Sequence, residues 1–340
     1  MKIVFAHHVS LSFVGGGEKF LINVSRLLKK RGYDVEIRSL PIHRRKKGYP
    51  IPKEIRYKES SFHRFDADVT YFIYIPVLWR AFKTSSPKIA GIHAPPLAPD
   101  LLSPEVLPKR LAQFLRLNGV EFAAPYLYFK KFGRRELKNF DAVHLVNPSM
   151  NIPHRAVYKI PNFVDTSFFK PCAEKSEKFT VLFVGRISWR KGFDLFLGVA
   201  KRFRKFGDIE FVTTGRVRSN LVRSLGYVDE EDMPRLYSSA HLTLYPSRVD
   251  TLGLVILESL ACGTPVLTTP IRAHTALGLP LLYGSSVGEL AKNVKAVYTS
   301  WEKGEYWSLF GKVREAVVEN YDVGKVLPKF EMMLKSVAAG

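Results

Sequence analysis

Apolar and polar positions follow one another along this chain in the order expected for short buried strands and amphipathic helices. An apolar run at 2–6 leads through the glycines at 15–17 into apolar residues at helical spacing over 20–28, and Gly32 ends that helix. A second strand is predicted over 35–40. A strand, a helix and another strand in this order predict a parallel sheet with a crossover helix.

The same alternation recurs after a linker. Pro148, Pro153 and Pro161 interrupt the pattern, which restarts at residue 180. Further strands are predicted over 69–74, 88–92, 142–146, 180–184, 209–213, 241–245 and 265–268, and further helices over 193–206, 230–238 and 253–261. The fold class is therefore α/β, with two Rossmann-like domains at 1–160 and 161–320 that we expect to face each other across a ligand cleft.

Composition places the chain among ordinary globular proteins. Its 340 residues are 46% hydrophobic and 24% charged, which allows a core for each of two domains. The longest apolar run, over 71–79, is far shorter than the roughly 20 residues that a membrane-spanning helix needs. Two cysteines without metal-ligand spacing argue against a disulfide framework or a structural zinc site. With no signal peptide predicted at the start, we expect a cytoplasmic protein.

Positive charge is concentrated in the first half. The net charge is +21, and residues 1–160 hold 28 Lys and Arg against 12 Asp and Glu. Such a field attracts phosphorylated substrates, anionic membrane surfaces or nucleic acids. The segment 106–140 interleaves apolar and basic residues, which fits either a helix on an anionic membrane or a core helix with a cationic outer face. Nucleic-acid binding is a weaker alternative, because the sequence contains none of the standard modules, and we expect no nucleic-acid partner.

Two cations follow the strand predicted at 180–184. Arg186 and Lys191 lie in the loop after that strand, beside Gly185 and Gly192. Cations at a strand end, next to glycines that let the backbone approach a ligand, suit a diphosphate. The simpler interpretation is a pair of solvated loop cations.

Two acids flank the start of the helix predicted at 253–261. Asp250 precedes the helix, whereas Glu258 lies inside it among apolar residues, where a carboxylate suggests a function. The N–H groups near Gly253, Leu254 and Val255 can bind a phosphate, and Glu258 can accept hydrogen bonds from ribose hydroxyls. For Asp250, capping the helix from the loop is the alternative.

Several segments together resemble the family 4 retaining glycosyltransferases, which have the GT-B fold. These are "VLFVGRISWRKGFDLFL", "GYVDEEDMPRLYSSAHLTLYPSRVDTLGLVILESLACGTPV" and "PNFVD" in the second half, and "GGGEKFLINVSRLLKKRGYDVEI", which resembles the family's glycine loop and first helix. The resemblance covers nearly the whole chain in order, with residues 40–140 matched least. It implies that the second domain binds a nucleoside-diphosphate sugar.

The resemblance also implies roles for individual residues. Arg186 and Lys191 would grip the diphosphate, Glu258 would hold the ribose, and Asp250 would contact the donor sugar in place of the family's Glu. Leu252 stands where the family usually has Phe. The remaining donor-binding positions are Gly15, Gly16 and Gly17, the helix start at Gly253, Leu254 and Val255, and Tyr227 and Val228, whose segment reads the nucleobase through its backbone.

His93 matches the family's histidine beside the transferred sugar, so the expected catalytic set is His93, Asp250, Arg186 and Lys191, with no side-chain nucleophile. Alone, His93 would more often be a satisfied structural histidine. The resemblance implies retention of anomeric configuration without a metal or cofactor, because cations and helix N–H groups stabilise the leaving diphosphate. It further implies that the first domain receives the acceptor and that a helix at 321–340 returns to that domain. The excess positive charge of the first domain favours an anionic acceptor, lipid-linked or saccharide.

Three other motifs have simpler explanations. The glycines at 15–17 imitate a dinucleotide fingerprint, but Phe20 replaces its third glycine, which leaves an NADP-dependent oxidoreductase only as an alternative. The acids at 66–68 precede their strand instead of ending it and predict a turn. Ser286 lies in a G-x-S-x-G pattern with no histidine after it, and with Glu289 it predicts a helix capping box.

Overall fold

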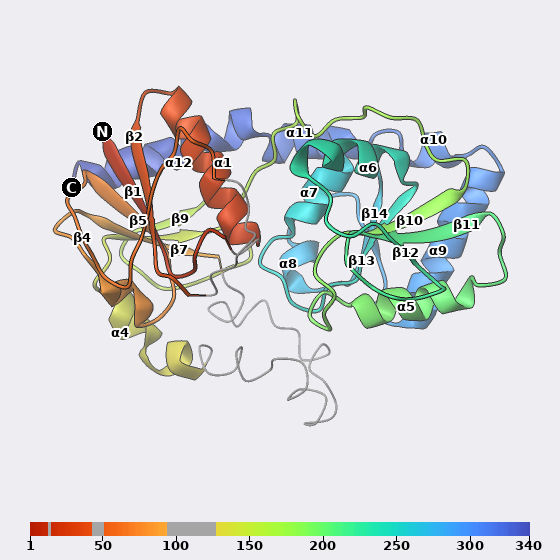
Figure 1. Ribbon diagram of the computed structural model, residues 1–340, viewed down its shortest axis with the longest axis horizontal. Coiled ribbons are helices and arrows are strands. Elements are labelled where there is room, and N and C mark those ends of the chain that lie inside the picture. Colours follow the sequence, from red (N-terminus) through yellow and green to blue (C-terminus); the bar gives the residue numbers. More distant parts are fainter. Residues whose placement is uncertain (13–14, 43–50, 94–126) are drawn as a thin grey trace. The chain divides into compact units, whose positions relative to one another are not determined.

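The computed structural model describes residues 1–12, 15–42, 51–93 and 127–340, which form two compact units (Figure 1). The first unit holds the described residues up to 162 together with 327–340, and the second unit holds 163–326. Each unit has its own parallel sheet. The predicted α/β class with two sheets is confirmed.

The first unit has a seven-stranded parallel sheet in the order β3-β2-β1-β5-β7-β8-β9. The strands are β1 (Lys2–His7), β2 (Asp34–Ser39), β3 (Arg56–Glu59), β5 (Val69–Ile73), β7 (Lys88–Ile92), β8 (Ala142–Leu145) and β9 (Val157–Lys159), with a separate pair of β4 (His63–Arg64) and β6 (Phe82–Lys83). The central strands are buried along their whole length, as expected when helices cover both faces of a parallel sheet.

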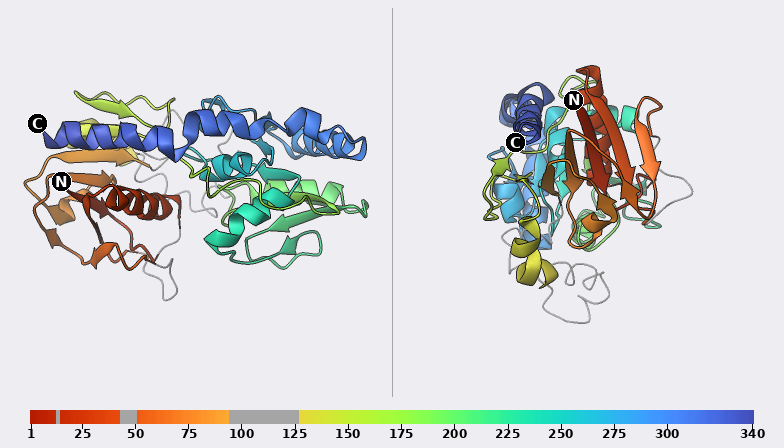
Figure 2. Two further views of the ribbon diagram at one scale, coloured as in Figure 1. Left: turned by 90° about the horizontal axis from the view of Figure 1, so that it is seen from above. Right: turned by 90° about the vertical axis from the view of Figure 1, so that its left-hand side faces the viewer.

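Helical segments complete the core of the first unit, and the first and the last of them come from the two ends of the chain (Figure 2). They are α1 (Gly16–Lys30), η1 (Leu78–Ala81), a π-helical turn η5 (Phe129–Gly133), α4 (Arg134–Leu137) and the end of α12 (Val323–Ala338). Phe20 of α1 and Phe330 of α12 pack against Tyr71 of β5, with ring centroids 6.4 Å and 5.3 Å away. The last residues of the chain are therefore part of this unit's core.

The second unit has a six-stranded parallel sheet in the order β12-β11-β10-β13-β14-β15. Its strands are β10 (Phe179–Phe183), β11 (Ile209–Thr213), β12 (Arg223–Ser224), β13 (Leu242–Tyr245), β14 (Val266–Thr268) and β15 (Leu282–Tyr283). Alternate side chains of β10 point to opposite faces. Val181 and Phe183 join one apolar cluster, and Leu182 joins another, so both faces of this sheet are buried.

Two helical layers supply the partners of those clusters. The helices of this unit are α5 (Phe193–Arg202), η6 (Glu230–Asp232), α6 (Met233–Ser239), α7 (Leu254–Ala261), α8 (Arg272–Thr275), α9 (Val287–Glu302), α10 (Tyr306–Phe310) and α11 (Val313–Tyr321). One layer contains α5 and α9, and the other contains α6, α7 and α11. This doubly wound arrangement leaves the loops at the carboxyl ends of the strands available for function.

The predicted strands are all present to within one or two residues, but two helices differ. The helix predicted over 193–206 ends at Arg202, because the chain turns at Phe203–Phe206 before Gly207 leads into β11. The helix predicted over 230–238 is a 3-10 turn followed by α6, with Pro234 in the first turn of α6. The sequence pattern missed the short strands β3, β4, β6, β9, β12 and β15.

Two smaller predictions are confirmed. Ser286 accepts a hydrogen bond from the Glu289 N–H (3.2 Å), while the Glu289 carboxylate accepts one from the Ser285 N–H (2.9 Å). Asp68 lies at the bend directly before β5, and its carboxylate accepts a hydrogen bond from the backbone N–H of Lys2. Neither motif has the geometry of the catalytic site that it imitates.

Much of the predicted basic and apolar segment lies outside the described residues, namely 106–126, as do the basic residues 44–47. In its described part, Phe129 and Leu137 are buried whereas Lys130 and Lys131 are exposed. In the part of the chain that the structure describes, no helix combines the length and apolarity needed to cross a bilayer.

Candidate functional site

Three neighbouring strands of the second unit end at one group of polar side chains. β10, β13 and β14 are adjacent and parallel, so the loops that follow them lie at the same edge of the sheet. These loops carry Lys191, Asp250 and Thr269. The edge is where a doubly wound sheet places its ligands.

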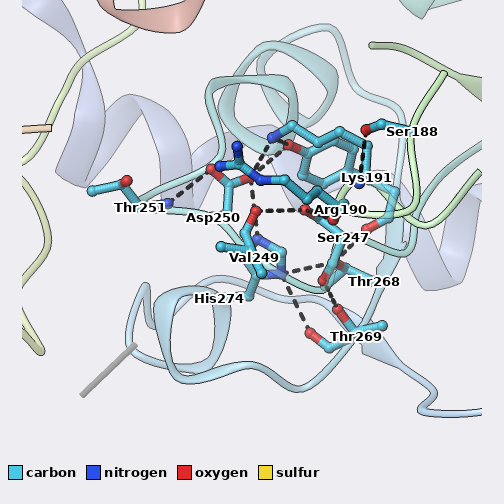
Figure 3. Close-up of polar contacts among 11 residues, drawn as sticks. Ser188, Arg190, Lys191, Ser247, Val249, Asp250, Thr251, Thr268, Thr269 and His274 are labelled. Carbon is cyan, nitrogen blue, oxygen red and sulfur yellow. Dashed lines mark hydrogen bonds and ion pairs between the residues drawn. The ribbon is translucent and has the colours of Figure 1, made fainter. Parts of the chain in front are cut away.

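Asp250 is the centre of this group (Figure 3). Its Oδ2 accepts hydrogen bonds from the Tyr245 hydroxyl (2.5 Å) and the Lys191 ammonium (3.2 Å), and His274 Nε2 lies 3.6 Å away. Its Oδ1 accepts from the backbone N–H of Thr251 at 2.8 Å. Lys191 also donates to the Tyr245 oxygen. One carboxylate therefore connects the loop after β10, the loop after β13, the end of β13 and the short helix α8.

The partners of Asp250 keep it ionised. Burial favours the neutral acid, but the Lys191 ammonium, His274 and the Tyr245 hydroxyl together hold the pKa of Asp250 well below its usual value. Burial lowers the pKa of Lys191, and the Asp250 carboxylate opposes part of that effect. Burial and the same carboxylate raise the pKa of Tyr245, which keeps its hydroxyl protonated. The site therefore contains a carboxylate next to an ammonium, largely withdrawn from water.

The loop that carries Lys191 is fixed by contacts with the loop after β13. The backbone N–H of Arg248 donates to the Arg190 carbonyl at 2.8 Å. The Arg248 guanidinium binds both carboxylate oxygens of Asp194, at 2.6 Å and 2.7 Å, and stacks over Trp189. Lys191 therefore lies in a braced loop, which is held by these contacts, and this distinguishes it from a solvated loop cation.

Gly192 allows the two loops to approach. Its φ of +71° lies in the left-handed region, and a Cβ at this position would overlap the carbonyl oxygen of Pro246. The glycine next to Lys191 is thus required both by backbone conformation and by a close contact. The sequence suggested that glycines here admit a ligand, and the structure shows that Gly192 admits the neighbouring loop.

Glu258 is buried inside α7, with 7% of its surface exposed. The Tyr237 hydroxyl donates to its Oε2 at 2.8 Å. Burial, and to a smaller extent the negative charge of Glu258, raises the pKa of Tyr237. Gly253, with φ of +88°, precedes the helix and leaves the N–H groups of Leu254 and Val255 at its start. A buried carboxylate with one tyrosine partner retains lone pairs for further hydrogen bonds.

The capping interpretation of Asp250 is wrong. Its carboxylate accepts from Thr251, which lies in the loop, and no side chain caps α7.

The sequence also gave no role to Tyr245 or His274. Tyr245 could have been suspected as the last residue of a buried strand, whereas His274 lies in a four-residue helix that no pattern marks. Its Nδ1 is held by Thr268 and the Thr269 carbonyl.

The other predicted donor residues lie around these loops or in the first unit. Arg186 is exposed in the loop after β10, and Tyr227 is 56% exposed while Val228 packs against the core of the second unit. Gly15 precedes α1, and Gly16 and Gly17 begin it, all in the first unit.

His93 follows β7 in the first unit. Its Nε2 lies 2.8 Å from the Tyr71 hydroxyl, and the ring of Phe20 packs 4.7 Å from its own. Burial, with smaller contributions from His144 and His7, lowers the pKa of His93 well below its usual value. His93 is therefore a neutral ring at physiological pH. Nearby, His7 and Glu18 form a buried pair at 2.6 Å that the sequence did not predict.

Comparison with known proteins gives a match over most of the second unit. Residues 178–300 match the family described as Glycosyl transferases group 1. An uncharacterized glycosyltransferase of Methanocaldococcus jannaschii is 24% identical over 176 residues, which are 46% of this chain and 44% of the relative. One component of the human phosphatidylinositol N-acetylglucosaminyltransferase is 29% identical over 128 residues, 33% of this chain and 26% of the relative. The matches thus span less than half the length of these curated relatives.

Similarity to solved structures extends over the whole chain. HepE of Anabaena, solved in complex with UDP and glucose, superposes with a TM-score of 0.71 at 15% sequence identity, covering 99% of this chain and 100% of that one. At this identity the likeness concerns the fold. The GT-B fold that the sequence motifs predicted is confirmed.

Proposed function

We propose that this chain, whose residues 178–300 match the group 1 glycosyl transferases and which has the GT-B fold, transfers a hexose from a nucleoside-diphosphate sugar to an anionic acceptor. The observation that carries the proposal is the braced Lys191 and Asp250 pair at the adjacent ends of β10 and β13, beside the start of α7. A cation and free helix N–H groups at one sheet edge suit a diphosphate.

The second unit supplies the donor site in this proposal. Lys191 and Arg186 bind the diphosphate, with the N–H groups of Leu254 and Val255 at the helix start. Glu258 accepts hydrogen bonds from the ribose hydroxyls with the lone pairs that Tyr237 leaves over. The backbone at Tyr227 and Val228 contacts the base, and Gly15, Gly16 and Gly17 contribute from the first unit. The bound UDP and glucose in the HepE structure support a uridine nucleotide as the first donor to try.

The residues of this site can stabilise the negative charge that forms on the leaving diphosphate. The acceptor oxygen replaces the diphosphate at the anomeric carbon, and negative charge grows on the departing phosphate. Lys191, Arg186 and the helix N–H groups stabilise that charge in the transition state, so that the chain itself provides the positive charge. Asp250 holds Lys191 in place and offers Oδ1 toward the sugar. The reaction proceeds with retention of configuration and without a metal.

The first unit receives the acceptor in this proposal. Residues 1–160 contain 28 Lys and Arg against 12 Asp and Glu, which favours a phosphate-bearing acceptor, either lipid-linked or a saccharide. The name of the human relative, part of a phosphatidylinositol glycosyltransferase, supports the lipid-linked class and a location at an anionic membrane surface.

Thermal unfolding with UDP, GDP, ADP and their hexose conjugates tests the donor site, with NADP and a short oligonucleotide as controls. A ligand at 100 times its dissociation constant stabilises by about 2.7 kcal/mol. We expect one nucleoside diphosphate and its sugar to stabilise the protein in EDTA, and Lys191→Met to abolish the shift. A response to NADP or the oligonucleotide alone would refute the proposal. Sugar transfer to vesicles containing phosphatidylinositol, compared with phosphatidylcholine vesicles, then tests the acceptor class.

A further inference from the structure

A continuous chain of hydrogen bonds runs through the core of the first unit and ends at His93. The Ile160 carbonyl lies 2.7 Å from His144 Nε2, and His144 Nδ1 lies 2.6 Å from the Tyr71 hydroxyl. The same hydroxyl lies 2.8 Å from His93 Nε2. Tyr71 and His144 are almost completely buried, so protein groups rather than water satisfy them.

The position of every proton in this series of hydrogen bonds follows from its first member, the Ile160 carbonyl. A carbonyl oxygen only accepts, so His144 carries its proton on Nε2 and donates to Ile160. In a neutral ring, Nδ1 is then an acceptor, and the Tyr71 hydroxyl must donate to it. The Tyr71 oxygen can therefore only accept from His93, which places the His93 proton on Nε2. The hydrogen-bond chain leaves one tautomer for each histidine.

Both rings meet the condition of neutrality that this assignment requires. Burial lowers the pKa of His144 to about 4, and burial together with His144 and His7 lowers that of His93. Polar groups that face His93 include His7 from β1, Tyr71 from β5 and His144 from β8. None of these adds a negative charge that would favour a protonated His93.

The core is shaped around the Tyr71 hydroxyl. A Cβ at Gly91, on the neighbouring strand β7, would overlap this oxygen, so glycine is required for the hydroxyl to lie between the two rings. Phe330 of α12 packs against Tyr71 at 5.3 Å and against His144 at 5.5 Å. Phe20 of α1 packs against His93. Three elements thus enclose the hydrogen-bond chain and hold its rings in place.

We propose that Tyr71 and His144 are positioning residues that hold His93 in its Nε2–H tautomer, in which Nδ1 can only accept a hydrogen bond. The effect of this tautomer on sugar transfer rests on the proposed function, whereas the tautomer itself does not.

Nitrogen-15 NMR of the histidine rings in the intact protein tests the tautomer directly, since protonated and unprotonated ring nitrogens have well-separated shifts. Signals of His93 and His144 are assigned by their loss in His93→Gln and His144→Gln. We expect both rings to be neutral at pH 7 with the proton on Nε2. A proton on Nδ1 of either ring overturns the inference. The tautomer is measured on the wild-type protein, and only the two variants used for assignment need to fold.

Tyr71→Phe separates positioning from simple packing. Without the hydroxyl, His93 loses its acceptor, and we expect a mixture of tautomers and a fall in kcat of about 10- to 100-fold, by analogy with other partners that orient a histidine. The matched control is Tyr74→Phe, which removes a buried hydroxyl that donates to Glu136. It should lower stability similarly but leave the His93 tautomer unchanged. A single Nε2–H form in Tyr71→Phe would rule out the positioning role, and failure of sugar transfer would refute the proposed function without affecting the NMR result.

Discussion

The Lys191 ammonium lies 3.2 Å from Asp250 Oδ2, and this ion pair joins the loop after β10 to the loop after β13. The side chains are 25% and 13% exposed, so the pair is partly withdrawn from water. Tyr245 donates to the same carboxylate oxygen. Asp250 therefore determines where the cation stands before any ligand arrives.

Replacing Asp250 with Asn should destabilise the second unit. The substitution leaves a half-buried ammonium without its counter-charge, and we expect a loss of about 2 to 4 kcal/mol in the free energy of unfolding, measured with urea at pH 7. The matched control is Asp194→Asn, which breaks a pair with Arg248 in which Asp194 is half exposed, and it should cost less than about 1 kcal/mol. Equal losses in the two variants would contradict the prediction that the Lys191–Asp250 pair contributes more to stability than the Arg248–Asp194 pair.

The cost of Asp250→Asn should also depend on pH. The pKa of Asp250 is lowered in the folded protein, so its contribution is complete above the unfolded value of about 4 and is lost as the pH falls toward the folded value. Unfolding curves of the wild type and the variant should therefore converge below pH 4. A difference that stays constant between pH 7 and pH 3 would show that Asp250 is not ionised in the folded state.

Replacing Lys191 with Met should affect catalysis more than folding. The substitution removes one stabilising charge from the leaving phosphate, and loss of one such donor typically lowers kcat about 100- to 1,000-fold. The thermal midpoint should fall as well, because the buried Asp250 carboxylate loses its counter-charge. Tyr245, His274 and Thr251 still contact that carboxylate, so activity is measured at a temperature at which the variant is folded. Lys201→Met, at an exposed position of α5, should retain full activity. Full activity in Lys191→Met would exclude the residue from the site.

Glu258→Gln, combined with deoxyribose nucleotides, tests the ribose contact. A hydrogen bond to a buried carboxylate contributes about 1.5 to 3 kcal/mol, so calorimetry should show roughly 10- to 100-fold weaker binding of the nucleoside diphosphate. Removing the 2′- or 3′-hydroxyl that Glu258 binds should weaken wild-type binding similarly and have little further effect in the variant. Additive losses in this cycle would place Glu258 away from the ribose.

The sequence predicted the fold more completely than the site. Continuous apolar runs such as that at β10 and β13 identify buried parallel strands, because both faces of such strands need apolar side chains. Short edge strands such as β3 and β15 carry no such signal, since their side chains are exposed or only partly buried. Periodicity therefore detects the core of each sheet but not its edges.

The motifs located Lys191, Asp250 and Glu258 but not the contacts between them. Spacing along the chain places Asp250 before a helix, which also left a cap as an alternative. Only the adjacency of β10, β13 and β14 brings Lys191 and His274 to the carboxylate that follows β13. Such contacts depend on strand order, which a local pattern does not encode.

The free energy of unfolding should also decrease as the pH falls, because buried histidines bind a proton less readily in the folded protein than in the unfolded chain. Burial lowers the pKa of His144 to about 4, so between that value and the unfolded value of about 6.5 the unfolded chain binds a proton that the folded protein does not. Stability then rises with pH across this window, by about 1.4 kcal/mol per pH unit for one proton. His144→Phe should make the dependence between pH 4 and pH 6.5 less steep by that amount.

The control for this prediction removes a hydrogen bond from the same unit without removing a titrating group. Asn139 donates to the Glu136 carbonyl at 2.8 Å, and Asn139→Ala should lower the free energy of unfolding equally at every pH. Unfolding in urea at half-unit intervals from pH 4 to pH 7.5 gives the three slopes. If His144→Phe shifts the curve in parallel like the control, His144 takes up a proton in the folded protein, and the neutral rings required to fix the tautomer of His93 are absent.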